Sequence, residues 1–108
     1  MNDLINKNCV PCQGGVPTLS EEEIKKHLIE LNDWRVVENH HIEKTFLFPD
    51  FKTALSFVNE VGALAEVEGH HPNISFTWGK VKLSIWTHKI NGLHENDFIL
   101  ASKVDRLS

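Results

Sequence analysis

The sequence has no long apolar segment, no excess of basic residues and only two cysteines, and each absence excludes a class of protein. No run approaches the ~18 consecutive apolar residues of a membrane-spanning helix, and the N-terminus lacks the apolar core of a secretory signal peptide. With 11 Lys and Arg against 15 Asp and Glu, the formal net charge is −4, which disfavours direct binding of nucleic acid. We therefore expect a soluble cytoplasmic protein that forms one domain from its 108 residues.

The two cysteines, Cys9 and Cys12, are spaced C-x-x-C but lack the surroundings that such a pair needs for most functions. A structural zinc site takes four ligands, and no second pair of cysteines is present. A redox-active pair would open a helix after a strand, whereas this pair lies beside Pro11 and Gly14. We interpret residues 1–17 as an irregular leader with two reduced thiols; a metal-binding or disulfide role is the alternative.

The first helix is predicted over residues 18–32. Ser20 as N-cap and Glu23 three residues later form a capping box, and Asn32 can end the helix. The apolar residues recur at spacings of four and three and form one stripe, made of Ile24, Leu28 and Leu31. This helix is therefore expected to bury one face.

A hairpin is predicted after this helix. Residues 34–37 and 41–48 are rich in β-branched and aromatic residues, and residues 38–40 between them have the character of a turn. The adjacent His40 and His41 fall at the tip of this hairpin. We interpret them as solvated loop residues.

The second helix is predicted to begin after Asp50, its N-cap, and to end at Gly69. Its apolar face consists of Phe51, Ala54, Leu55, Val58, Val61, Gly62 and Ala65. A glycine within a helix lowers its stability relative to alanine, so Gly62 predicts a close packing neighbour.

A second hairpin and a last helix complete the expected fold. Residues 73–78 and 81–88 alternate in polarity around Gly79-Lys80, where a leading glycine suits a type II′ turn. The last helix is predicted over residues 95–107. The order helix, strand, strand, helix, strand, strand, helix predicts an α+β two-layer sandwich, with a four-stranded, mostly antiparallel sheet and three helices on one face. We expect residues 18–108 to form this single domain.

Two adjacent histidines at the end of the second helix are the strongest candidates for a functional site. His70 and His71 follow Gly69, where the negative end of the helix dipole favours imidazolium. Imidazole titrates near neutrality and can therefore donate or accept a proton. Glu66 lies one helical turn before His70, and the second hairpin returns His88 toward the pair, so three imidazoles are expected to converge.

Asp97 has two interpretations that do not exclude each other. With His94 as the N-cap, Asp97 takes the third position of the last helix and is a capping-box acid. It is also a carboxylate close to the expected histidine cluster.

Several of these residues together resemble the signature of the pterin-4a-carbinolamine dehydratases. The signature consists of Glu66, His70-His71-Pro72, Trp78, Thr87-His88, Gly92-Leu93 and Asp97. The resemblance covers roughly residues 18–107, and C-x-x-C followed by Gly-Gly resembles the leader of some members. It implies that His70, His71 and His88 are catalytic. It also implies that Glu66, Asp97 and Trp78 bind the substrate, with no metal or cofactor.

Two positions depart from the family's pattern. Ile74 stands where many members have tryptophan, so one aromatic contact to the ligand or the pocket wall is lost. His94 stands where the pattern usually has a threonine, which predicts a weaker start of the last helix. Neither departure removes a residue with a role in proton transfer.

The resemblance implies dehydration of a 4a-hydroxytetrahydropterin, a pterin 4a-carbinolamine. The substrate loses its 4a-hydroxyl as water and a proton from N5 to give quinonoid dihydropterin, which recycles the cofactor of aromatic amino acid hydroxylases. Such an elimination needs a general acid and a general base, each of which contributes about 10²–10⁴ in rate. We expect His70 and His88 to transfer protons, His71 to position the substrate and Glu66 to orient an imidazole.

Two other functions are alternatives. In animals the resembled family also serves as a dimerisation partner of a homeodomain transcription activator, which makes a protein-interaction module the second hypothesis. A zinc hydrolase with three histidine ligands is the third. Because the core is small and all three helices carry apolar stripes, we expect a homodimer or homotetramer.

Overall fold

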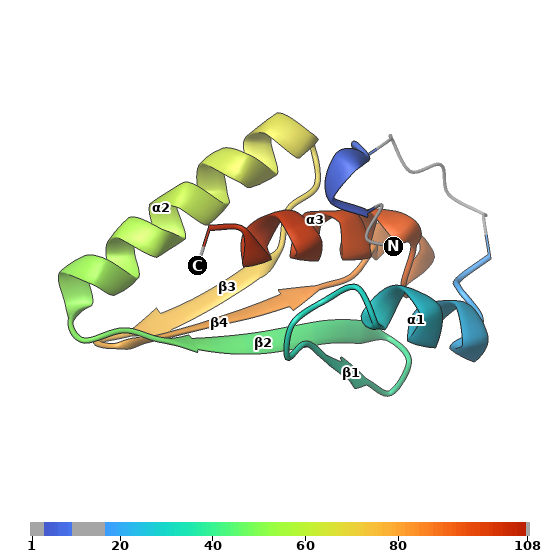
Figure 1. Cartoon of the computed structure of the whole chain (residues 1–108), viewed down its shortest axis with the longest axis horizontal. Coiled ribbons are helices and arrows are strands. Elements are labelled where there is room, and N and C mark those ends of the chain that lie inside the picture. The colour runs from blue at the N-terminus through green and yellow to red at the C-terminus, as the bar shows by residue number, and fades with distance from the viewer. Residues whose placement is uncertain (1–3, 10–16, 108) are drawn as a thin grey trace.

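Four strands form one sheet in the computed structural model, which describes residues 4–9 and 17–107 (Figure 1). In chain order the elements are η1 (Leu4–Asn6), α1 (Glu21–Leu28), β1 (Arg35–Val37), β2 (His41–Leu47), α2 (Phe51–Glu68), β3 (Asn73–Thr77), β4 (Lys80–Ile85), η2 (His88–Ile90) and α3 (Glu95–Asp105). The strand order is β1-β2-β4-β3, and every neighbouring pair is antiparallel. The predicted α+β fold and its order of elements are confirmed. None of the helices in the described residues is long and apolar enough to cross a membrane.

The core lies between one face of the sheet and the helices. Ile42 and Phe46 of β2 pair with Ile85 and Val81 of β4, and all four side chains are buried. Because successive residues of a strand point to opposite faces, the positions between them form the outer face of the sheet. Figure 1 shows α2 and α3 along the same side of the sheet. The buried apolar side chains of the helices include Ile24, Ala54, Phe57, Val61, Phe98, Leu100 and Val104.

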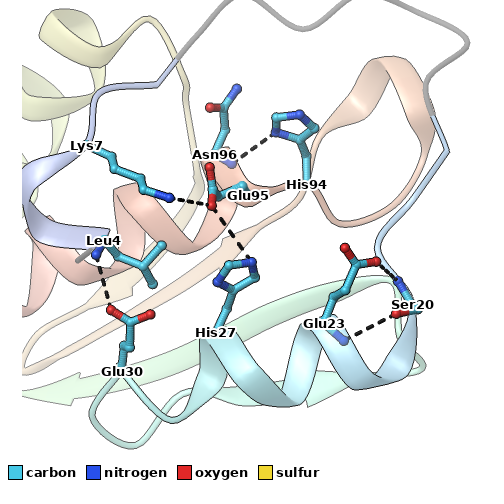
Figure 2. Close-up of polar contacts among 9 residues, drawn as sticks. All are labelled: Leu4, Lys7, Ser20, Glu23, His27, Glu30, His94, Glu95 and Asn96. Atoms are coloured by element: carbon cyan, nitrogen blue, oxygen red, sulfur yellow. Dashed lines mark hydrogen bonds and ion pairs between the residues drawn. The ribbon is translucent and has the colours of Figure 1, made fainter. Parts of the chain in front are cut away.

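The predicted helix caps are present. Glu23 N–H donates to Ser20 Oγ over 3.3 Å and Ser20 N–H donates to the Glu23 carboxylate over 3.0 Å, so the capping box is complete (Figure 2). The Ser20 N–H holds the pKa of the Glu23 carboxyl below its usual value. At the start of α2, the Asp50 side chain accepts the Thr53 N–H over 2.8 Å. Gly69 ends α2 in the left-handed conformation, at φ 68°.

α1 and α3 end earlier than predicted. α1 stops at Leu28 instead of residue 32, because the chain then tightens and Leu31 N–H donates to Leu28 O over 3.0 Å. Leu31 is still buried, so the predicted apolar stripe survives the shorter helix. α3 likewise stops at Asp105, two residues before the predicted end.

The turn of the second hairpin lies one residue earlier than predicted. Lys80 pairs with Thr77, so Trp78 and Gly79 form the turn and Lys80 belongs to β4. A Cβ atom at Gly79 would lie 2.7 Å from Phe48 O, and Phe48 N–H donates to Gly79 O over 2.8 Å. Glycine is needed here because two backbone segments approach closely, which the turn pattern of the sequence does not reveal.

The close neighbour expected at Gly62 is absent. No atom that a side chain could meet lies within 4 Å of the position a Cβ would take. The expectation was therefore wrong, because the space beside α2 at Gly62 is open.

Residues 4–9 of the leader are anchored to the domain. Leu4 is 1% exposed and belongs to the core, and its N–H donates to the Glu30 carboxylate over 3.2 Å (Figure 2). Lys7 forms an ion pair of 2.9 Å with Glu95 at the start of α3. Residues 4–9 therefore contribute contacts to the fold, although their segment was predicted to be irregular. Cys12 lies outside the described residues.

Replacing Gly62 by alanine should raise the free energy of unfolding by about 0.5–1 kcal/mol, because alanine restricts the unfolded chain and nothing blocks its methyl group. Urea denaturation monitored by circular dichroism measures the change. Gly69→Ala is the matched control and should destabilise, since its backbone is left-handed. A loss of stability in Gly62→Ala would contradict the open space.

Leu4→Ala should lower the free energy of unfolding by about 2–5 kcal/mol, the usual range for truncating a buried leucine. The same urea titration tests this, with Ile29→Ala as control because that side chain is 84% exposed. If the two variants lose equally little, residues 4–9 are not part of the cooperative fold.

Candidate active site

A cavity of about 630 Å³ lies where α2 ends and the segment after β4 passes. Glu66, His70 and His71 line it from the end of α2, and His88 lines it from η2. The structure thus brings together the three histidines that the sequence singled out. Trp78 is not among the described residues that line this cavity; it lies in the β3–β4 turn, at the far end of β3, and is 63% exposed.

The chain leaves α2 abruptly, which presents both histidines at the helix end. Gly69 N–H and His70 N–H both donate to Ala65 O, over 2.9 and 3.3 Å. Pro72 then prevents the helix from continuing. The two imidazoles therefore lie beside the carbonyl end of α2, where positive charge is stabilised.

Asp97 is the buried partner of His70. The Asp97 side chain is fully buried and accepts three hydrogen bonds, from His70 Nε2 (2.5 Å), Thr87 Oγ1 (3.0 Å) and His94 N–H (2.8 Å). His94 caps α3 through Nδ1, which accepts Asn96 N–H over 3.0 Å (Figure 2). Both interpretations of Asp97 hold, since one carboxylate caps α3 and orients His70.

The second acid, Glu66, contacts His71 instead of His70. His71 Nε2 lies within hydrogen-bond distance of the Glu66 carboxylate, and both side chains are more than half exposed. In each pair the acceptor is a carboxylate, so Nε2 carries the hydrogen and the neutral ring leaves Nδ1 as an acceptor. The site has one buried and one exposed carboxylate–imidazole pair.

His88 does not lie on the strand as predicted, because β4 ends at Ile85 and His88 opens the short helix η2. A backbone bridge between Thr87 and Gly92 closes this loop. The His88 ring stacks on the Trp86 ring, with centroids 4.4 Å apart and an interplanar angle of 17°. Sequence analysis missed Trp86, whose signal is its position two residues before His88.

Cys9 was interpreted only as a leader thiol, yet it lines the cavity. Cys9 N–H donates to Glu68 Oε1 over 2.9 Å, and Sγ lies 3.5 Å from Asn96 O. Burial, with the neighbouring Glu68 charge, raises the pKa of this free thiol to about 12. Burial disfavours the ionised form of Glu68. Hydrogen bonds from Cys9 and Lys103 favour that form more strongly, so the pKa of this carboxyl is lowered.

The prediction that His40 and His41 are solvated is wrong. Residues 38–40 do form the hairpin turn, but both imidazoles are half-buried against the Trp86 ring. Sequence analysis could not find this contact because β2 pairs with β4, and that register is set by the tertiary fold. Among the described residues, no group of three His, Cys, Asp or Glu side chains is arranged to hold a metal ion.

Comparison with known proteins identifies a family for this chain. A sequence profile described as Pterin 4 alpha carbinolamine dehydratase matches residues 17–107. A protein of Alkaliphilus metalliredigens that is named as a pterin-4-alpha-carbinolamine dehydratase is 51% identical to this chain. The match covers 98% of this chain and 96% of that protein. One of Rickettsia canadensis is 54% identical over 97% of each chain.

Solved structures lead to the same family. A transcriptional coactivator/pterin dehydratase from Brucella melitensis superposes with a TM-score of 0.79 at 32% identity, over 84% of this chain and 98% of that one. A pterin dehydratase-like protein, described as a RuBisCO assembly factor in the alpha-carboxysome, gives 0.62 at 28% identity, over 70% and 89%. This chain therefore belongs to the pterin 4 alpha carbinolamine dehydratase family, and with that family it is a hydro-lyase.

Proposed function

We propose that the cavity dehydrates a 4a-hydroxytetrahydropterin to quinonoid dihydropterin by histidine acid–base catalysis. The convergence of three imidazoles from two separate segments on one cavity carries this proposal. The C4a–O bond breaks, the leaving hydroxyl takes a proton to become water, and N5 loses its proton. The reaction thus needs one proton donor and one acceptor.

The paired carboxylates favour a division of labour. Asp97 accepts the Nε2–H of His70 and leaves Nδ1 as the acceptor, so we assign His70 as the base that accepts the N5 proton through Nδ1. His88, held by the Trp86 ring, gives its proton to the leaving hydroxyl. The proton gained by His70 returns to His88 through solvent, which restores both rings for the next turnover.

The exposed pair of Glu66 and His71 suits binding at the cavity mouth. Both side chains are mostly solvent-exposed, so a substrate can reach them before it enters. Glu66 fixes the orientation of the His71 ring, and His71 then positions the pterin. Trp78, from the far end of β3, can contact a substrate only if a second copy of the chain brings it there.

In the cell, this activity would recycle the tetrahydropterin cofactor of aromatic amino acid hydroxylases. The alternative is a protein-interaction module of the same fold. The solved relatives named as a coactivator and as an assembly factor keep this alternative open for the family. The paired imidazoles favour catalysis for this chain, because a docking surface has no need of them.

Self-association is part of the proposal. β3 has β4 as its one neighbour among the described strands, which leaves its other edge without a strand. Large apolar side chains are exposed on β2, α2, β3 and the β3–β4 turn, namely Leu47, Phe51, Leu55, Ile74 and Trp78. We propose that a second copy covers them in a homodimer or homotetramer.

His70→Ala and His88→Ala should each slow dehydration by about a hundredfold or more, because each removes one proton-transfer group. His71→Ala should raise KM more than it lowers kcat, as a loss of binding does. Turnover of chemically generated 4a-hydroxytetrahydropterin, corrected for the uncatalysed rate, measures both. His27→Gln is the control, because His27 is not among the described residues that line the cavity. Near-full activity of folded His70 and His88 variants would exclude this site.

Light scattering at micromolar concentration should give a mass two or four times the 12.3 kDa of one chain. Trp78→Glu should shift the mass toward one chain, because it places a charge within the proposed interface. Ile29→Glu adds the same charge at an exposed apolar side chain outside the proposed interface and is the control. A monomer mass for the unaltered protein contradicts the proposal.

A further inference from the structure

Four rings form a continuous cluster behind the cavity. Trp86 stacks on His88, and the rings of His40 and His41 lie against Trp86 with centroids 5.2 and 5.7 Å from it. Trp86 and His88 line the cavity, whereas His40 and His41 do not. The first hairpin therefore contacts the loop that carries His88 through side chains that do not line the cavity.

His40 is also hydrogen-bonded to the loop that carries His88. His40 Nε2 lies 2.9 Å from Asn91 Oδ1, and Asn91 N–H donates to His88 O over 3.1 Å. Asn91 thus joins the His40 ring to the backbone of His88. A three-residue helix such as η2 has weak hydrogen bonds of its own, so side contacts of this kind decide where its side chains point.

The hydrogen-bond partners fix the state of the two hairpin imidazoles. Asn91 Oδ1 can only accept, so His40 Nε2 carries a hydrogen and His40 Nδ1 accepts in the neutral ring. His41 Nδ1, 3.0 Å away, then donates to it. His41 Nε2 faces Glu43 at 3.7 Å. One hydrogen bond between the two Nδ1 atoms therefore joins the His41 ring to the His40 ring.

The turn that presents His40 is itself held in a costly conformation. Glu38 and Asn39 both have positive φ, 53° and 55°, the type I′ conformation of tight hairpin turns, which Asn adopts readily and Glu only at a cost. Asn39 donates to the Glu21 carboxylate of α1 over 2.9 Å, and His40 N–H donates to Val37 O over 2.9 Å. Backbone strain of this kind persists where the surroundings fix a functional geometry.

From these contacts we infer that His40 is a positioning residue, which holds His88 in its catalytic orientation through Trp86 and Asn91. The inference rests on the proposed function of His88. It adds the β1–β2 turn to the machinery of the site. Misplacing a reacting group by ~1 Å can cost about a hundredfold in rate, so a partial loosening should cost less but remain measurable.

A double-mutant cycle tests the inference. His40→Ala should lower kcat about tenfold and change KM by less than about twofold, because orientation and not binding is lost. Asn91→Gly should also lower kcat with little change in KM. Glycine keeps the left-handed backbone and removes the side chain that carries the Oδ1 acceptor. In a His88→Ala background both changes should alter kcat by less than about twofold. The inference is overturned if His40→Ala leaves kcat unchanged in the otherwise unaltered protein. It is also overturned if kcat falls equally in that protein and in the His88→Ala background.

A spectroscopic readout separates this inference from the proposed activity. The Trp86 ring current shifts the imidazole proton resonances of His88, which His88→Ala identifies by their loss. His40→Ala and Asn91→Gly should move or broaden these resonances, and Asn39→Gly should not, because its side chain contacts α1. Unchanged His88 resonances in Asn91→Gly overturn the inference even if His40→Ala fails to fold. A protein without dehydratase activity that still shows the shifts would refute the activity alone.

Discussion

The buried Asp97 carboxylate is the constraint on which the site depends. Burying a charge without partners costs several kcal/mol, so three donors must stay in place around it. Those donors come from the segment after α2, the loop after β4 and the residue that caps α3. The three segments that build the cavity therefore share one acceptor and cannot move independently. Folding of α3 and assembly of the site are in this sense the same event.

Features that depend on neighbours in sequence could be predicted. Ser20 and Glu23 cap α1, Asp50 starts α2, and Gly69 ends it, because each needs only residues within one helical turn. The alternation of β2 and β4 identified the core face, whereas Ile74 of β3 is exposed despite the same pattern. The convergence of His88 with His70 and His71 followed from the second hairpin, which brings distant residues together by a short connection.

Features that depend on tertiary contacts could not be predicted. Gly79 is required by the backbone of Phe48, which is 31 residues away, and Leu4 is buried although its segment has no periodicity. His40 lies in the predicted turn, but its contact with Trp86 depends on the register of β2 on β4, which local patterns do not show. The family resemblance identified Trp78, but a single chain leaves that side chain away from the cavity.

The raised pKa of Cys9 has a chemical consequence for the cavity. The thiolate is the form that reacts with oxidants and alkylating agents. With a pKa of about 12, roughly one thiol in 10⁵ is ionised at pH 7. Cys9, the leader residue that lines the cavity, is therefore present almost entirely as the unreactive thiol. Under the proposed function, the product quinonoid dihydropterin would therefore meet almost no thiolate at Cys9.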